Sequence, residues 1–163
     1  MMMLLFTVKG DLYGLDVSQV VEIIPCVDLK EIPRTPKCVA GLFMYRGRAV
    51  PVIDISLMLS GATTQKLLST RIVLINYPVG GEQFRVVGVL AEHATETISV
   101  KHSDFIASAL GDKDEGFVDY IVMNNRGMIQ RINVDRIFPA SLHALIANQA
   151  REYDQLSEMQ KWT

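Results

Sequence analysis

Residues 41–54 decide the fold class of this chain, and they read Gly41-Leu42-Phe43-Met44-Tyr45-Arg46-Gly47-Arg48-Ala49-Val50-Pro51-Val52-Ile53-Asp54. Two apolar runs, 41–45 and 49–53, flank the polar triplet 46–48, which contains one glycine. Short apolar runs around a glycine-containing turn are typical of a β-hairpin. Pro51 has no amide hydrogen to give to a neighbouring strand, so we expect it at a sheet edge or a bulge.

The same hairpin pattern occurs three more times along the chain. The paired runs are 4–8 with 12–17, 71–77 with 84–90, and 120–123 with 128–134. Four hairpins in 163 residues predict an all-β fold. We expect antiparallel sheets that close into barrels, because closure leaves no free strand edge.

Helical signals are confined to two segments. Asp54 predicts a short helix over 54–59 by capping its first turn, and Gly61 follows near its end. Pro139 opens a C-terminal helix over 139–160. The apolar stripe of this helix is expected to dock on the sheets, and it consists of Leu142, Leu145, Ile146, Tyr153 and Leu156.

A weak internal repeat relates the two halves of the chain. Gly14 precedes Glu22 by eight positions, and each lies in a strand-like run. Gly88 precedes Glu96 by the same number, 74 positions further along. Downstream, the pair Arg-Gly recurs 80 positions apart, at 46–47 and 126–127, so the second half carries about six extra residues.

Each Arg-Gly pair leads to an aspartate, Asp54 in the first half and Asp135 in the second. The extra residues are expected within 103–116. The repeat predicts two similar β-lobes, at about 4–60 and 68–138, in a single domain of residues 1–163 with strand exchange between them. Chance similarity is the alternative, since Gly, Glu and Arg-Gly are common at turns.

The composition limits the classes of partner. Hydrophobic residues make up 49% and charged residues 21%, which is enough apolar material for a packed core. The net charge is −2, whereas nucleic acids and anionic membranes select basic surfaces. No apolar run approaches the roughly 20 residues of a membrane span, and residues 1–6 lack the basic start of a signal peptide. We therefore expect a cytoplasmic protein with Cys26 and Cys38 reduced.

No enzyme signature is present in the sequence. There is no glycine-rich phosphate loop, no nucleophile elbow, and no metal-binding spacing around His93, His102 or His143. We expect no catalytic residue, no cofactor and no metal. The alternatives from other classes are a small OB-like barrel that binds nucleic acid and an enzyme of unrecognised type.

Arg46 is the candidate functional residue of the first hairpin. It lies at the predicted tip, after Tyr45 and before Gly47. Tyrosine and arginine are the residue types that most often anchor protein interfaces. The alternative is an ordinary exposed arginine in a turn.

Several runs resemble the CheW-like domain family of chemotaxis coupling proteins. Residues 12–16, Leu-Tyr-Gly-Leu-Asp, and 20–23, Val-Val-Glu-Ile, resemble its opening signature. The hairpin at 41–54 resembles the family pattern in which Arg-Gly precedes Pro-Val and Asp. Residues 85–89 and 132–137 resemble strands of its second half. The resemblance extends from Leu4 to about Phe138.

The resemblance implies two intertwined five-stranded β-barrels that share a core, followed by the C-terminal helix. It implies a non-catalytic, cytoplasmic adaptor, recruited to membrane receptor arrays, that binds a CheA-type histidine kinase and the cytoplasmic tip of a chemoreceptor. Nucleic-acid binding and membrane insertion are not expected. The partner-binding residues that it implies are Val20, Glu22, Gly41, Tyr45, Arg46 and Gly47.

The chain departs from the family pattern at two places. Met44 stands where the family has asparagine, and Asp119 and Tyr120 stand where the family has glycine. These departures indicate a divergent paralogue with its own receptor and kinase. The run 43–48 and residues 69–71 resemble adaptors of surface-sensing, Wsp-type pathways rather than those of flagellar chemotaxis.

Overall fold

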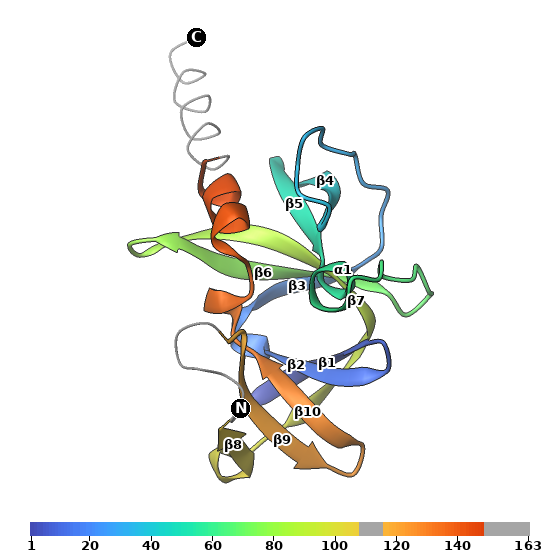
Figure 1. The fold of residues 1–163 in the computed structure, drawn as a ribbon, viewed down its shortest axis with the longest axis vertical. Coiled ribbons are helices and arrows are strands. Elements are labelled where there is room, and N and C mark those ends of the chain that lie inside the picture. The colour runs from blue at the N-terminus through green and yellow to red at the C-terminus, as the bar shows by residue number, and fades with distance from the viewer. Residues whose placement is uncertain (108–115, 149–163) are drawn as a thin grey trace.

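The computed structural model describes residues 1–107 and 116–148, and strands dominate this part of the chain (Figure 1). The elements are β1 (Met2–Val8), β2 (Asp11–Asp16), η1 (Val17–Gln19), β3 (Val20–Pro25), β4 (Val39–Tyr45), β5 (Arg48–Asp54), α1 (Ile55–Ser60), β6 (Arg71–Gly80), β7 (Gln83–Ser99), η2 (His102–Asp104), β8 (Phe105–Ala107), β9 (Val118–Asn124), β10 (Gly127–Ile132) and η3 (Val134–Arg136). Residues 140–148 form a further helical segment. The predicted all-β fold with few helices is confirmed.

All four predicted hairpins form. They are the antiparallel pairs β1–β2, β4–β5, β6–β7 and β9–β10. The β4–β5 turn has positive φ angles at both central residues, 49° at Arg46 and 79° at Gly47. Turns with two positive φ angles match the right-handed twist of the flanking strands, and glycine adopts them without strain. The predicted helix also forms as α1, with Asp54 accepting from the Leu57 amide and Gly61 ending it at φ 77°.

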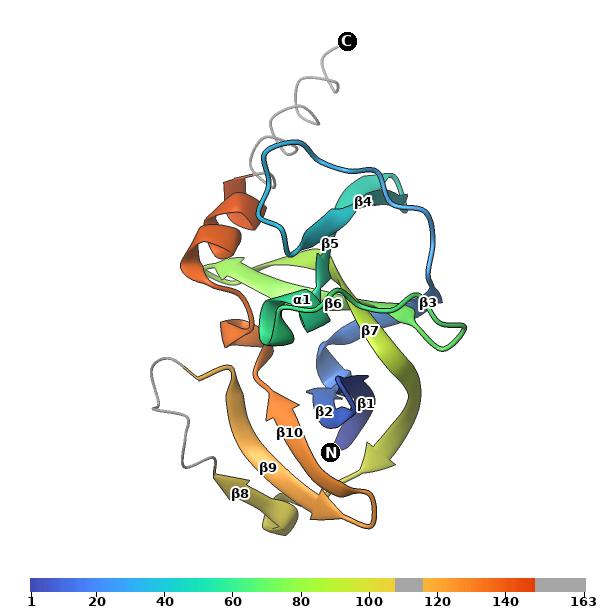
Figure 2. The same ribbon diagram turned by 45° about the vertical axis from the view of Figure 1, so that its right-hand side comes forward.

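The strands form two sheets that we name after their positions in Figure 1. The upper sheet has the order β3-β6-β7-β5-β4, and the lower sheet has the order β7-β1-β2-β10-β9-β8. Strands β1 and β2, from the start of the chain, therefore lie between β7 and β10, and β2 pairs with β10 from the last third of the chain. Figure 2 shows this exchange of strands between the two halves of the chain.

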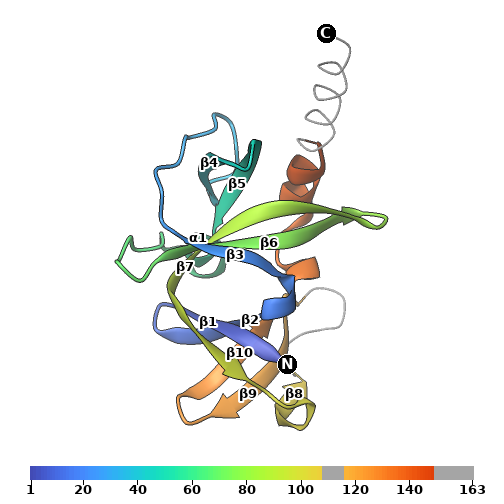
Figure 3. The same cartoon turned by 180° about the vertical axis from the view of Figure 1, so that it is seen from behind.

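Strand β7 belongs to both sheets. Its residues up to Ala91 pair with β6 in the upper sheet, and those from Glu92 to Ser99 pair with β1 in the lower sheet. Figure 3 shows β7 running from one sheet to the other. At the crossing the register shifts between Leu5 and Thr7, and His93 has a positive φ of 54°. The hairpin pattern predicted a strand that ends at Leu90, because it contains no signal for this bulge.

The predicted closed barrels need correction. In the described residues the upper sheet ends at β3 and β4, and the lower sheet ends at β8 and the second half of β7. The sheets have five and six strands when β7 is counted in both, where two sets of five were expected. Two pairings, β2–β10 and β5–β7, are parallel. Hairpin signals specify only neighbours in sequence, so they contain no information on these long-range pairs.

The strand registers confirm the first part of the internal repeat. In the lower sheet Leu5 lies opposite both Gly14 and Glu96. In the upper sheet Leu74 lies opposite both Gly88 and Glu22. The offset of 74 therefore relates structurally equivalent positions, namely Gly14 with Gly88 and Glu22 with Glu96.

The second part of the repeat is wrong by one residue. Tyr45 pairs with Arg48 across the first turn, and Asn124 pairs with Gly127 across the second. The hairpins are thus related by 79 positions rather than 80, and Arg126 occupies the place of Gly47. Asn133, not Asp135, matches Asp54, since both cap the short helix that follows.

Three apolar clusters fill the structure. The largest lies between the sheets and includes Phe6, Ile75 and Val89. The two smaller clusters lie on the opposite faces, one on the lower sheet and one on the upper sheet, because their residues alternate along the strands with those of the largest cluster. The helical segment 140–148 docks on the largest cluster through buried Leu142 and Ile146, with Leu145 partly buried, as its stripe predicted. Tyr153 and Leu156 lie outside the described residues.

Tyr77 joins the upper sheet to the C-terminal helical segment. Its ring is buried and packs 4.8 Å from the ring of Phe138. Burial and the charge of Asp135 raise the pKa of Tyr77 to about 12, so its hydroxyl keeps its proton. The hydroxyl shares a hydrogen bond of 2.8 Å with Nδ1 of His143.

We predict that Gly88→Ala lowers the free energy of unfolding by about 1–3 kcal/mol, because a Cβ here overpacks the core. That Cβ would lie 3.0 Å from methyl groups of the buried Ile72 and Val52, which are β-branched and stiff. At the equivalent Gly14 the Cβ meets the flexible end of Met3, which can change rotamer. Gly14→Ala should therefore cost less in urea unfolding, and a larger loss there than in Gly88→Ala would contradict the packing argument.

We predict that alkaline pH weakens the fold through Tyr77. Its pKa is about 12 in the fold against the ordinary 10.0, so the unfolded chain loses the proton first. The stability that this pKa difference contributes is fully present below pH 10.0 and is lost as the pH rises to about 12. The loss amounts to roughly 2–3 kcal/mol. Urea unfolding at pH 9 and pH 11.5 should show a larger decrease in the wild type than in Tyr77→Phe. Equal decreases in the wild type and in Tyr77→Phe would show that groups other than Tyr77 cause the loss of stability.

Candidate protein-interaction site

The tip of the β4–β5 hairpin meets β3 at an exposed group of polar side chains. The Tyr45 hydroxyl donates to Oε2 of Glu22 in a short hydrogen bond. Nη2 of Arg46 lies 3.7 Å from the same oxygen, and its Cζ lies 5.2 Å from the centroid of the Tyr45 ring. We call Glu22, Tyr45 and Arg46 the tip cluster.

The tip cluster joins the two edges of the upper sheet. Glu22 lies in β3 and Tyr45 ends β4, and these strands have no backbone ladder between them in the described part of the chain. A second link is made by Lys30, which exchanges two 2.9 Å backbone hydrogen bonds with Leu42. The side chains of the tip cluster and one isolated backbone bridge thus link the β3 and β4 edges, which backbone pairing would join in a closed barrel.

The tip cluster contributes little to stability. The Arg46 side chain is 78% exposed and that of Glu22 is 42% exposed, and such exposed ion pairs contribute about 0–1 kcal/mol. Arg46 also has a φ of 49°, a left-handed conformation that side chains other than glycine adopt at a cost. An exposed guanidinium held at this cost is available to a partner, and it can bind a carboxylate through two parallel hydrogen bonds.

The Tyr45 hydroxyl stays protonated at neutral pH. Its hydrogen bond to Glu22 is the main cause that raises its pKa, partial burial adds to the rise, and the charge of Arg46 opposes it. The hydroxyl is therefore a donor, and it occupies an oxygen of Glu22 that would otherwise accept from Arg46.

The remaining predicted site residues have different surroundings. Val20 is half-buried and packs against the largest apolar cluster, and a register shift in β3 puts it on the face opposite to that of Glu22. Gly41 lies where the backbone of Lys30 crosses β4, and a Cβ there would be 2.7 Å from the Lys30 carbonyl oxygen. Gly47 completes the turn. The structure brings Glu22, Tyr45, Arg46 and Gly47 together, whereas Gly41 lies further back along β4.

The lower sheet contains an equivalent pair that the sequence did not single out. Arg126, in the β9–β10 turn, forms an ion pair and a hydrogen bond with Glu96 on β7. The side chains are 53% and 43% exposed. The internal repeat contained a signal for this pair, because Glu96 matches Glu22. The repeat aligned Arg126 with Arg46, whereas the structure aligns it with Gly47. Asn124 stands at the place of Tyr45 and accepts from the Arg126 amide at 2.8 Å.

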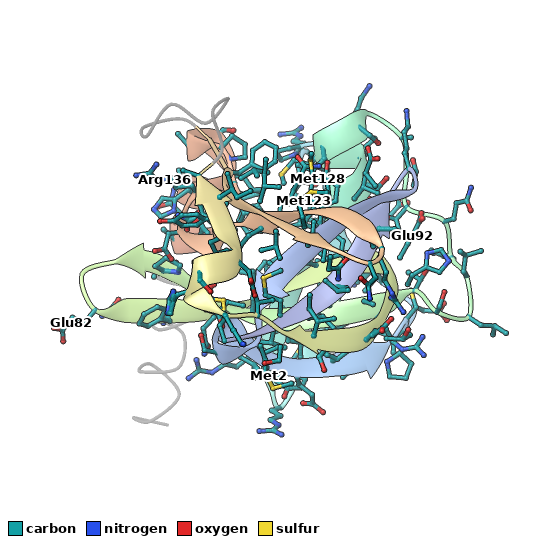
Figure 4. All side chains as sticks on the ribbon, turned by 90° about the horizontal axis from the view of Figure 1, so that it is seen from below. Met2, Glu82, Glu92, Met123, Met128 and Arg136 are labelled. Atoms are coloured by element: carbon teal, nitrogen blue, oxygen red, sulfur yellow. The ribbon has the colours of Figure 1, made fainter. Side chains whose placement is uncertain are left out.

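Exposed apolar side chains accompany both hairpins. Near the tip cluster Met44 is 63% exposed, and Val21 and Ile23 on the outer face of β3 are each 40% exposed. On the lower sheet Met123 and Met128 lie opposite each other and are more than half exposed (Figure 4). Apolar side chains beside an exposed arginine are typical of protein interfaces.

The described residues offer no assembled site for other chemistry. They contain no group of three or more His, Cys, Asp or Glu side chains that could hold a metal ion. Cys26 and Cys38 are free thiols, and burial raises the pKa of Cys38, which disfavours its reactive thiolate. No helix in the same residues is long and apolar enough to cross a membrane.

Comparison with known proteins gives the family. The family described as CheW-like domain matches residues 2–141. The chain belongs to the CheW-like domain family. The two motifs quoted above and the paired strands of both sheets lie within the matched range.

CheW-like relatives are known from sequence and from structure. The chain is 23% identical over 99 residues to the chemotaxis protein CheW of Helicobacter pylori and 28% identical over 97 residues to that of Klebsiella aerogenes. The matches cover 61% and 60% of this chain but span only 57% and 55% of those relatives. The crystal structure of the scaffolding protein TtCheW from Thermoanaerobacter tengcongensis superposes with a TM-score of 0.74 at 25% identity, over 85% of this chain and 88% of that one.

We predict that neither glutamate is important for stability. Glu22→Gln and Glu96→Gln should each lower the free energy of unfolding by less than about 1 kcal/mol, because both ion pairs are exposed. The double variant should show the sum, since the pairs lie in different sheets. Urea unfolding measures all three. A loss above about 2 kcal/mol in either single variant would instead give that pair a structural role in holding the sheet edges together.

Proposed function

We propose that this chain is a non-catalytic adaptor that couples a chemoreceptor-type sensor to a CheA-type histidine kinase. The observation that carries the proposal is the CheW-like domain match over residues 2–141. Two relatives named chemotaxis protein and a structural neighbour named scaffolding protein support it. In this proposal the adaptor works in the cytoplasm, where it joins receptor arrays at the membrane.

The tip cluster is the proposed contact with the sensor. Arg46 supplies an exposed cation, and Met44 supplies exposed apolar surface in the same hairpin. Val20 stays a predicted contact, although it packs on the largest apolar cluster. Gly41 and Gly47 act through the backbone, because they set the path of β4 and its turn. This arrangement fits the end of a helical hairpin, whose carboxylates and terminal carbonyls accept from a guanidinium.

The kinase is proposed to bind an exposed apolar strand edge. Strand β3 ends the upper sheet and has exposed Val21 and Ile23 on its outer face. A related domain in the kinase can pair with such an edge and cover these side chains. The assignment to a surface-sensing, Wsp-type pathway stays a prediction from residues 43–48 and 69–71.

Nucleic-acid binding is the weaker candidate. An OB-like module needs a basic groove with stacked aromatic side chains. The chain has a net charge of −2 and 7% aromatic residues, and neither property favours nucleic-acid binding.

We predict that Arg46→Glu disrupts sensor-dependent control of the kinase and leaves the fold intact. Arg46 is exposed, so the thermal midpoint of the variant should stay within about 4 °C of that of the wild type. A loss of about 1 kcal/mol gives a shift of this size in a protein of this length. Purified adaptor, sensor and kinase are combined, and kinase autophosphorylation is measured with and without sensor. Sensor-dependent control should fall at least tenfold.

Arg126→Glu is the matched control, because it reverses the charge of the equivalent pair in the lower sheet. It should keep wild-type control of the kinase. Equal loss of sensor-dependent kinase control in both variants would contradict the assignment of the tip cluster as the sensor contact. Full control in the Arg46→Glu variant would contradict it as well. Failure of the wild-type protein to bind either the sensor or the kinase would contradict the adaptor function itself.

A further inference from the structure

The two hairpins provide a comparison within one chain. In the lower sheet Arg126 is in direct hydrogen-bonding contact with Glu96. In the upper sheet Arg46 remains 3.7 Å from Glu22, beyond hydrogen-bonding distance. The glutamates occupy equivalent register positions, whereas Arg126 stands at the place of Gly47, one residue further along its turn than Arg46.

Besides the position of the arginine, the two clusters differ chemically at Tyr45. Its hydroxyl donates to Oε2 of Glu22, the same oxygen that Arg46 faces. The equivalent residue in the lower sheet is Asn124, whose side chain accepts from the Arg126 backbone and leaves Glu96 to the guanidinium. A glutamate that already accepts a short hydrogen bond from tyrosine binds a second donor less strongly.

The Tyr45 ring also directs the guanidinium. The Cζ atom of Arg46 lies 5.2 Å from the ring centroid, within the range of a cation–π contact. In this position the side chain keeps 78% of its surface exposed, against 53% for Arg126. The guanidinium is therefore oriented by the ring yet keeps donors directed to solvent.

We propose that Tyr45 is a positioning residue that holds Glu22 away from Arg46 and so presents the Arg46 guanidinium to a carboxylate on the sensor. The proposal rests on the adaptor function and on the tip cluster as its sensor contact. Without the hydroxyl, Glu22 pairs directly with Arg46, as Glu96 does with Arg126, and the sensor carboxylate must compete with it. Specificity for an acidic partner is thus set by a tyrosine that does not need to touch that partner.

The test compares Tyr45→Phe with the wild type, first without any partner. Phenylalanine keeps a ring below the guanidinium and removes only the hydroxyl. The NMR signal of the Arg46 side-chain Nε–H should move toward that of Arg126, as a direct ion pair forms. Tyr120→Phe is the matched control, because Tyr120 also lies under an arginine, with its ring centroid 5.4 Å from Cζ of Arg131. The control should leave the Arg46 signal unchanged.

Sensor affinity is then measured with the cytoplasmic fragment of the sensor. Tyr45→Phe should weaken binding about tenfold, the loss expected when one charge-assisted hydrogen bond is diverted. The double variant Tyr45→Phe/Glu22→Gln should restore affinity to within about twofold of the wild type, because neutral glutamine holds the guanidinium less strongly. Restoration by the second substitution separates positioning from a direct contact of the hydroxyl with the sensor.

The outcomes separate this inference from the proposed function. An unchanged Arg46 signal, unchanged affinity in Tyr45→Phe, or no restoration in the double variant overturns the inference while Arg46→Glu still loses binding. Full binding by Arg46→Glu overturns the sensor contact and the inference together. Three results together establish Tyr45 as the positioning residue. They are a shifted Arg46 signal and a tenfold loss of sensor affinity in Tyr45→Phe, and restored affinity in the double variant.

Discussion

The architecture depends on one strand that serves two sheets. β7 spans 17 residues, and its first half is covered by β6 and β5 while its second half is covered by β1. A strand that pairs on both sides fixes the register of every neighbour, since a slip of one residue would turn its buried side chains outward. The bulge at His93 lets the strand change sheets, and a hydrogen bond of 2.8 Å between the Thr7 hydroxyl and the His93 imidazole supports it. The apolar cluster between the sheets forms because β7 holds both of them in one piece.

The two halves reuse this arrangement and then differ at their edges. Each half puts a glutamate on an edge strand and an arginine in the turn of the hairpin opposite it. The identity of a single neighbouring residue, tyrosine or asparagine, decides whether that arginine is bound within the chain or left for another molecule. The two halves thus share their strand pattern and differ in the contacts that their turn arginines make.

Local features of the fold were accessible from the sequence, and long-range ones were not. The hairpins and α1 follow from turn residues and the Asp54 cap, which act over a few positions. The extension of β7 beyond Leu90, the strand β8 and the parallel pairs depend on partners far along the chain, and no local pattern specifies them. At the site, the residues Glu22, Tyr45 and Arg46 were predicted together, but the role of the Tyr45 hydroxyl depends on a distance. The Glu96–Arg126 pair was missed because Arg-Gly recurs one position away from the equivalent turn.

The exchange of strands has a consequence for how the chain is made. The β1–β2 hairpin leaves the ribosome before its two neighbours, the end of β7 and β10, which follow only after about 75 and 110 further residues of synthesis. Until then its apolar side chains, which include Met3 and Leu5 on one face and Leu15 on the other, are not covered by these strands. Even the amino terminus is in its final place only when its ammonium group reaches the carbonyl oxygen of Val100, at 3.1 Å. Contacts of such long sequence separation make folding slow. The β1–β2 hairpin therefore reaches its native surroundings only after β10 has been synthesised, and its apolar side chains are exposed to other molecules until then.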